Sequence, residues 1–257
     1  MILYAAIIAL FCCSCYGVLA TPVSSFEYLI YEDENLASII KFIGDEKNVI
    51  IPRKIDGYEV KRIGISAFTA SDIESVTIPD TVEDIWDRAF QYCKSLHTVK
   101  IKSKKLKIWD EAFDGCKKLK NINLPSGLTM IGVQAFFGCE SLEKIFIPNT
   151  VYDWGPEAFC ATSISELEFE DGIEAIGDYA CFWSLDGKLE SVTIPASVKE
   201  IGEYSFDNHL KEAVFLGDAP RVMGNMGIYT DTVIRYKEGT SGWDSNTYKD
   251  YKLIPYN

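Results

Sequence analysis

Histidine is nearly absent from this sequence, and that scarcity limits the chemistry the chain can perform. The 257 residues include two histidines, His97 and His209. In a stacked-repeat fold, which the spacing of the other residues predicts, these histidines lie about five repeats apart. They therefore cannot share a metal ion or activate one nucleophile. After residue 20 the chain also lacks G-x-S-x-G, a glycine-rich phosphate loop, H-E-x-x-H, Cys-x-x-Cys and a calcium loop. We therefore expect no enzyme activity, no catalytic residue, no metal site and no cofactor.

Basic residues are also outnumbered. The chain has 25 lysines and arginines against 38 acidic residues, which gives a formal net charge of −13. Nucleic-acid binding needs lysine and arginine clustered on one face, so we expect no nucleic-acid partner. An anionic membrane surface would repel such a chain, whereas a cationic partner would not.

The N-terminal segment, Met1 to Ala20, contains no charged side chain. The stretch Ile2–Leu10 is apolar, and Val18, Leu19 and Ala20 stand where a signal peptidase selects short side chains. This pattern predicts a secretory signal peptide with cleavage after Ala20. An uncleaved membrane anchor is the alternative, since about 20 apolar residues can span a bilayer. Lipidation of a cysteine at position 12, 13 or 15 is a further alternative.

A short internal repeat, with a period of about 22–23 residues, dominates what is present. The pair Ala-Phe recurs at a nearly constant step, at Ala67-Phe68, Ala89-Phe90, Ala112-Phe113, Ala135-Phe136 and Ala158-Phe159. An isoleucine stands four residues before the alanine in most copies, with Trp154 as an exception. After the phenylalanine comes a segment of the form L-x-x-V-x-I, often followed by proline. Regularity of this kind predicts a stacked repeat architecture.

Each repeat divides into a strand and a turn. The segment Leu96/Val99/Ile101 alternates as a short strand with one buried face does, and a following proline such as Pro148 ends the strand. The intervening residues, such as 81–93, carry apolar residues at spacings of three and four, which predicts a helical or 3₁₀ turn. We call one such repeat a rung, and a single rung cannot bury both its strand side and its turn side. Stacked about 4.8 Å apart, the rungs form a parallel sheet over a continuous core.

These motifs resemble the BspA-like leucine-rich repeats of secreted microbial proteins. Ile147-Pro148 and Val192-Thr193-Ile194-Pro195 match the family pattern most closely, and the resemblance runs from about Phe26 to the C-terminus. It implies an α/β solenoid, a right-handed superhelix of about seven 22–23-residue repeats. One side would be a parallel sheet, the other short turns and helical pieces, with a β-rich cap at each end. The resemblance also implies surface adhesion and binding of proteins or host matrix.

The chain divides into four expected segments. These are the signal peptide at 1–20, an N-terminal capping β-hairpin at 21–50, the solenoid at 51–216 and a C-terminal cap at 217–257. Caps are expected because an open solenoid end would expose core and strand edges. Strands over 26–31 and 38–43 would form the hairpin. The last segment is rich in turn residues and aromatic side chains.

Five cysteines follow the signal segment. They are Cys93, Cys116, Cys139, Cys160 and Cys181. The first three are evenly spaced at the repeat period, each three residues after the repeat phenylalanine, which favours a ladder of small buried side chains. A disulfide between adjacent rungs and a metal site are the alternatives.

Trp86 and Trp109 occupy the position that glycine holds in other copies, and each is followed by an aspartate, Asp87 or Asp110. Because they stand one rung apart, their rings are expected to be neighbours. We interpret this Trp86/Trp109 platform as a candidate binding site for a sugar or a protein. The alternative is that both rings fill packing gaps.

A second candidate site is the outward side of the strands. Its central column reads Thr77, Lys100, Asn123, Phe146, Glu168, Thr193 and Val214. Phe146 is the one aromatic side chain in this column. The alternative here is a plain solvated sheet face.

Together these features predict a secreted or cell-surface protein, monomeric and non-catalytic, that binds a protein, matrix or glycan ligand outside the cell. Membrane contact would come only through an uncleaved N-terminal segment. A carbohydrate-binding or glycan-processing protein with an aromatic platform is the alternative function, and an inert spacer is a third.

Overall fold

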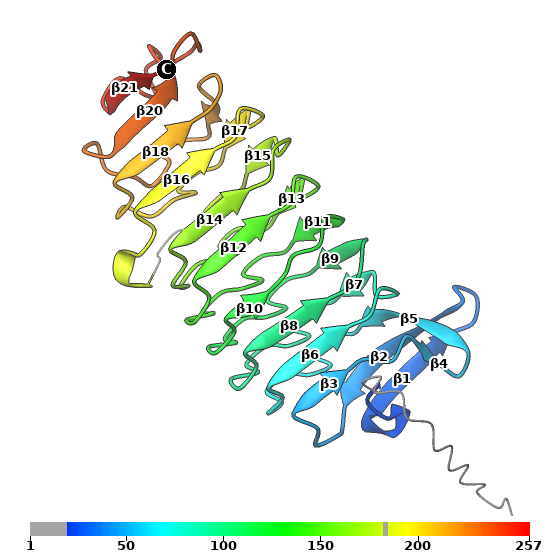
Figure 1. The fold of residues 1–257 in the computed structure, drawn as a ribbon. Helices are drawn as coiled ribbons and strands as arrows, with labels where there is room; N and C mark the ends of the chain where they lie inside the picture. The colour runs from blue at the N-terminus through cyan, green and yellow to red at the C-terminus, as the bar shows by residue number, and fades with distance from the viewer. Residues whose placement is uncertain (1–19, 182–184) are drawn as a thin grey trace, which may run out of the picture.

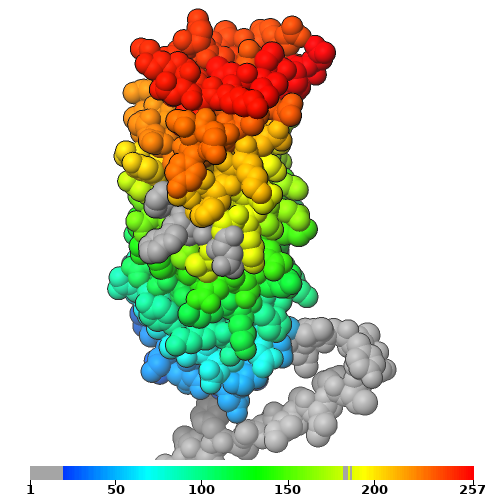
Figure 2. All heavy atoms as spheres, turned by 90° about the vertical axis from the view of Figure 1, so that its left-hand side faces the viewer, coloured from blue at the N-terminus to red at the C-terminus, as the bar shows by residue number. Residues whose placement is uncertain are grey.

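The chain winds into an elongated β-solenoid (Figure 1). The structure is a computed structural model that describes residues 20–181 and 185–257. The expected signal peptide therefore lies, apart from Ala20, outside the described residues. Figure 2 shows the successive turns as bands of colour stacked from the N-terminal to the C-terminal end.

The L-x-x-V-x-I segments form one side of the solenoid. We call the solvent side of these strands the front face. The front strands are β3 (Asn48–Ile50), β6 (Ser75–Ile78), β8 (Thr98–Ile101), β10 (Asn121–Ile122), β12 (Lys144–Ile147), β14 (Glu166–Phe169), β16 (Ser191–Ile194), β18 (Glu212–Phe215), β20 (Val233–Lys237) and β21 (Lys252–Tyr256). Pairing is parallel, and Val76 lies opposite Val99, which in turn lies opposite Ile122. Successive copies of one sequence column therefore stack in register on the core side.

The number of turns is about ten, not the seven expected. Parallel pairing already joins β3 to β6, and it continues through β18, β20 and β21. The turns that lead into β3, β20 and β21 lack the Ala-Phe pair, so the count of repeats from that pair was too low.

The second side of each turn is a strand and a sharp bend, and the expected helical pieces are wrong. The back strands are β5 (Tyr58–Ile63), β7 (Asp84–Ile85), β9 (Leu106–Ile108), β11 (Leu128–Ile131), β13 (Asp153–Trp154), β15 (Ala175–Ile176), β17 (Glu200–Ile201) and β19 (Arg221–Val222). The described residues contain no α-helix, only the short 3₁₀ turns η1 (Val23–Ser25) and η2 (Leu185–Gly187). The fold class is accordingly a β-solenoid and not α/β.

A residue with left-handed backbone conformation in each of these turns explains why no helix forms. The residue before the repeat alanine has positive φ in successive turns, for example Arg88 (57°), Glu111 (54°) and Gln134 (53°). A right-handed helix cannot continue through such a residue. The chain instead bends there and returns to the front face. The residue types at these positions do not indicate a left-handed conformation, because such positions usually hold glycine or asparagine.

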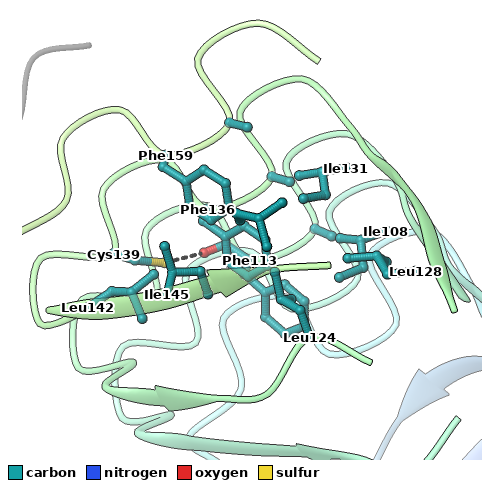
Figure 3. Packing of buried hydrophobic residues seen from close by; sticks show 14 of the residues in the cluster. Ile108, Phe113, Leu124, Leu128, Ile131, Phe136, Cys139, Leu142, Ile145 and Phe159 are labelled. Atoms are coloured by element: carbon teal, nitrogen blue, oxygen red, sulfur yellow. Dashed lines mark hydrogen bonds between the residues drawn. The ribbon is translucent and has the colours of Figure 1, made fainter. Parts of the chain in front are cut away.

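The core is a spine of stacked rings. Neighbouring centroids in this series are 4.8–5.3 Å apart, along Phe42, Phe68, Phe90, Phe113, Phe136 and Phe159. Figure 3 shows three of these rings beside the inward-pointing Leu142 and Ile145. The ring spacing is close to the distance between paired strands, so one phenylalanine fills the centre of each of these six turns.

Cysteine occupies a buried column beside this spine. Cys93, Cys116 and Cys139 each direct Sγ at a phenylalanine carbonyl of the preceding turn, at 3.0, 3.1 and 3.3 Å. All five described cysteines are free of disulfides and buried. Burial raises the pKa of the Cys116 and Cys139 thiols, so these groups are held neutral. The ladder of small buried side chains is confirmed.

Both ends of the solenoid are covered. At the N-terminal end β1 (Phe26–Tyr31) and β2 (Leu36–Phe42) form an antiparallel hairpin, and β2 pairs parallel with β5, which also pairs with β4 (Lys54–Ile55). At the C-terminal end the ring of Trp243 lies 5.0 Å from those of Phe215, Tyr236 and Tyr248. Aromatic side chains thus close the last turns over the core.

Candidate binding surface

The front face carries the expected outward column. Register places Thr77 beside Lys100, Phe146 beside Glu168, and Thr193 beside Val214. Phe146 is 46% exposed, although large apolar side chains at the other positions of β12 and β14 point into the core or are half-buried. An exposed phenylalanine in the middle of a flat, polar strand face is the first feature that marks this surface.

Two hollows flank Phe146, and it lines both. The first, of about 390 Å³, lies between β10 and β14 and is lined by Ile122, Asn123, Leu124, Lys144, Ile145, Phe146, Glu166 and Glu168. The second, of about 540 Å³, continues across β14 to β16 and includes Glu170, Ser191 and Thr193. A third hollow of about 330 Å³ extends the groove back to Thr98 and Lys100.

The hollows coincide with interruptions of the front sheet. Within the described residues, strand pairing joins β3 to β10, β12 to β14, and β16 to β21, but not β10 to β12 or β14 to β16. A side chain also shortens β10 on its other edge. Asn123 turns its side chain toward β8, where Nδ2 donates to the Ile101 carbonyl at 2.9 Å and Oδ1 accepts from the Ile101 amide at 3.1 Å. This side chain takes the place of backbone pairing between β8 and the end of β10, and Asn123 lines the first hollow.

Charge is segregated on either side of Phe146. Residues 98–120 contain eight lysines and three acidic residues, whereas residues 166–190 contain eight acidic residues and one lysine. On the front face these turns present Lys100 and Lys102 at one end and Glu166 and Glu168 at the other, all exposed. The net charge of −13 hides this division. Counting charges turn by turn would have found it from the sequence.

The Trp86/Trp109 platform lies on the back of the solenoid, next to β7 and β9. Both residues are half-buried. The Arg62 guanidinium lies 5.5 Å from the Trp86 ring centre, and Lys107 Nζ lies 6.0 Å from that of Trp109. Trp109 Nε1 donates to Asp84 at 3.0 Å. Each ring therefore already has a cation against it.

The two aspartates of the platform, Asp87 and Asp110, accept hydrogen bonds from backbone amides. Asp87 Oδ1 accepts from the Asp110 amide at 3.1 Å, and Asp110 Oδ1 accepts from the Val133 amide at 2.8 Å. Asp178 repeats the arrangement toward the Glu203 amide. This column of aspartates links consecutive turns.

Other chemistry finds little support in the geometry. His97 directly precedes β8 and His209 lies three residues before β18, five turns apart as expected. Among residues 20–181 and 185–257, no cluster of three or more His, Cys, Asp and Glu could hold a metal ion. Within the same residues no helix has the length and apolar character that crossing a membrane requires.

The fold and this surface define a class: a leucine-rich repeat solenoid with an open groove along its strand face. The family model for the BspA type leucine rich repeat region matches six copies, over residues 61–187 and 178–217. The chain therefore belongs to the BspA-type leucine-rich repeat family. None of the curated proteins matches it in sequence.

Solved structures support the fold. The leucine rich repeat protein of T. pallidum is 27% identical, with 80% of this chain and 86% of that chain covered and a TM-score of 0.61. A leucine rich cell surface protein from Faecalibacterium prausnitzii A2-165 is 22% identical, with 93% and 73% covered and a TM-score of 0.61. The pneumococcal vaccine antigen PcpA is 22% identical, with 81% and 66% covered and a TM-score of 0.51.

Proposed function

We propose that this chain is a non-catalytic binding protein, exposed at the cell surface or secreted, whose partner docks on the front face around Phe146. The observation that carries the proposal is the exposed Phe146 between two hollows, with lysines on one side and glutamates on the other. Interfaces draw most of their binding energy from a few central aromatic or arginine side chains ringed by polar groups. The front face has this arrangement.

Location outside the cell is part of the proposal. The solved relatives include proteins described as a leucine rich cell surface protein and a pneumococcal vaccine antigen, which supports a location outside the cell. The uncharged N-terminal segment, Met1 to Ala20, agrees with an exported chain.

A protein partner suits the front face better than a glycan. Carbohydrate sites rely on aromatic rings with open faces and on free carboxylates or amides. The rings at Trp86 and Trp109 already face Arg62 and Lys107, and the neighbouring aspartates accept backbone hydrogen bonds. The front face instead offers an apolar anchor with charges of both signs around it.

An array of matrix proteins and glycans tests the proposal. We expect the chain to bind a protein on the array, and Phe146→Ala to weaken that binding at least tenfold. Tyr152→Ala is the matched control, because Tyr152 is a 74% exposed aromatic residue away from the front strands. It should bind like the wild type.

Two results would contradict the proposal. If the double variant Trp86→Ala/Trp109→Ala loses binding while Phe146→Ala retains it, the site is the Trp86/Trp109 platform. Turnover of a polysaccharide by the purified chain would show that it is an enzyme.

A further inference from the structure

The charges of the front face are arranged in a way that one particular partner would satisfy. The lysine-rich turn of β8 and the acidic turn of β14 are separated by residues 121–143, which contain no lysine or arginine, and by Lys144, which is paired with Glu166. Lys100 and Glu168 stand in the same outward column but three strands apart, about 14 Å at ordinary strand spacing. They cannot reach each other, and neither forms an ion pair with another described residue.

We propose that the partner of the front face is a second copy of this chain, related by a two-fold axis. The inference rests on the proposed function, because it uses the same surface. A two-fold interface must be self-complementary, so a patch on one copy meets a different patch of the same face on the other. A face that is basic on one side of its centre and acidic on the other meets this condition.

The position of the axis follows from the column. An axis parallel to the strands and midway between β10 and β12 reverses the order of the turns in the second copy. Lys100 then faces Glu168 of the second copy, and Glu168 faces Lys100. Lys102 and Glu170 stand just past the ends of β8 and β14, two residues farther along the chain, and pair in the same way. Glu170 Oε2 also accepts from the Asn149 amide of its own chain at 2.9 Å. Four Lys–Glu pairs are formed in total, two on each side of the axis.

The centre of the interface also fits. The same axis sets Phe146 of one copy against Asn123 of the other, which lines the first hollow and whose side chain bonds sideways to Ile101 of β8. The exposed ring of one copy thus enters the hollow of its partner, twice by symmetry. Burial of the two phenylalanine rings contributes the apolar part of the binding free energy. The four ion pairs fix how the strands of the two copies are aligned.

The size of the face indicates a weak dimer. The four front strands from β8 to β14, about 4.8 Å apart and with four residues of about 3.3 Å each, make a contact region of roughly 20 Å by 13 Å on each copy. This is smaller than a stable specific interface, so we expect a transient dimer with a Kd of ~100 µM. Copies displayed on two cells would hold together through many such contacts at once.

Charge reversal with sedimentation velocity tests the arrangement. The chain is measured at low salt over a concentration range that spans the expected Kd. We expect a concentration-dependent dimer that weakens at about 0.5 M NaCl, where screening is strong. Lys100→Glu and Glu168→Lys should each weaken dimerisation at least tenfold, because each places like charges opposite one another twice.

Recombination of the charges is the decisive measurement. An equimolar mixture of Lys100→Glu with Glu168→Lys should form a heterodimer, since every pair across the axis is again Lys–Glu. The double variant Lys100→Glu/Glu168→Lys should form a homodimer for the same reason. Lys249→Glu, at an exposed position in the C-terminal turns, is the control for net charge and should dimerise like the wild type.

Phe146→Ala gives an independent readout, because its exposed side chain can be removed without disturbing the core. It should also weaken dimerisation at least tenfold. A chain that stays monomeric at concentrations well above the expected Kd overturns the inference, as does a dimer that none of these front-face changes affects. If the chain stays monomeric but binds a different protein in a Phe146-dependent way, the proposed function stands and self-association falls.

Discussion

The rings of Phe113 and Phe136 lie 5.3 Å apart with 4° between their planes, and neither is exposed. Each ring is the neighbour of another above and below, so removing one breaks two stacking contacts and leaves a cavity between turns. We expect Phe113→Ala to lower the free energy of unfolding by about 3–5 kcal/mol. Urea unfolding followed by circular dichroism measures the loss.

Phe146 supplies the matched comparison for this prediction. It is the same residue type, but its side chain stands on the front face, 46% exposed. Phe146→Ala should change the free energy of unfolding by less than about 1 kcal/mol, a typical surface effect. Equal losses for Phe113→Ala and Phe146→Ala would contradict the spine of stacked rings.

Substitutions at two glycines distinguish the stability cost of backbone strain from that of a steric clash. Gly115 and Gly138 have almost the same positive φ, 66° and 65°. A Cβ on Gly115 would lie 2.4 Å from Cδ1 of Tyr92, whereas a Cβ on Gly138 would meet nothing closer than 3.8 Å. Gly138→Ala should therefore lower stability by about 1 kcal/mol through the left-handed backbone alone. Gly115→Ala should lose more, and Gly115→Ala/Tyr92→Ala should recover that excess in thermal unfolding.

The strand columns could be predicted from the sequence because burial there follows strict alternation along each strand. Val99 and Ile145 alternate with exposed residues, and proline after a strand marks its end. The back of each turn could not be predicted in the same way. Arg88, Glu111 and Gln134 adopt a left-handed conformation that their residue types do not indicate, so apolar spacings of three and four suggested a helix.

The candidate site was predictable in part. The column containing Phe146 and Lys100 follows from alternation. The hollow beside Phe146 does not, because it lies where the front sheet is interrupted between β10 and β12, and the repeat pattern continues through that break. The roles of Asp87 and Asp110 were also hidden, since a hydrogen bond to the next turn requires the stacking geometry and not only the repeat spacing.

Buried thiols make stability depend on alkaline pH. Burial raises the pKa of Cys116, Cys139 and Cys181 above the ordinary thiol value. At high pH the unfolded chain loses these protons while the folded chain keeps them, so the folded state binds more protons and stability falls as pH rises. The fall should begin near pH 8.5 and reach at most about 1.4 kcal/mol per pH unit for each thiol.

Thermal unfolding between pH 7 and pH 10 measures this effect. The variant Cys116→Ala/Cys139→Ala/Cys181→Ala should be less stable at pH 7, because three small cavities form, but its melting temperature should depend less on pH. The range below pH 10 limits the contribution of tyrosine ionisation. An unchanged pH dependence in this variant would show that the thiols are not the responsible groups.

Asp110 tests whether the aspartates beside the tryptophans hold the turns together. Its carboxylate accepts a hydrogen bond from the Val133 amide at 2.8 Å, across one turn of the solenoid. Asp110→Ala removes this hydrogen bond, and water can replace the carboxylate because Val133 is exposed, so we expect a loss of about 0.5–1.5 kcal/mol in the free energy of unfolding. Asp153→Ala is the control, because Asp153 is exposed and its carboxylate has no hydrogen-bond partner among the described residues. It should change stability by less than about 0.5 kcal/mol.

Because the Asp110 carboxylate binds a backbone amide, its removal should lower stability without weakening partner binding at temperatures where the chain stays folded. A variant that keeps full stability and loses its partner would instead make Asp110 a ligand-binding residue of the Trp86/Trp109 platform.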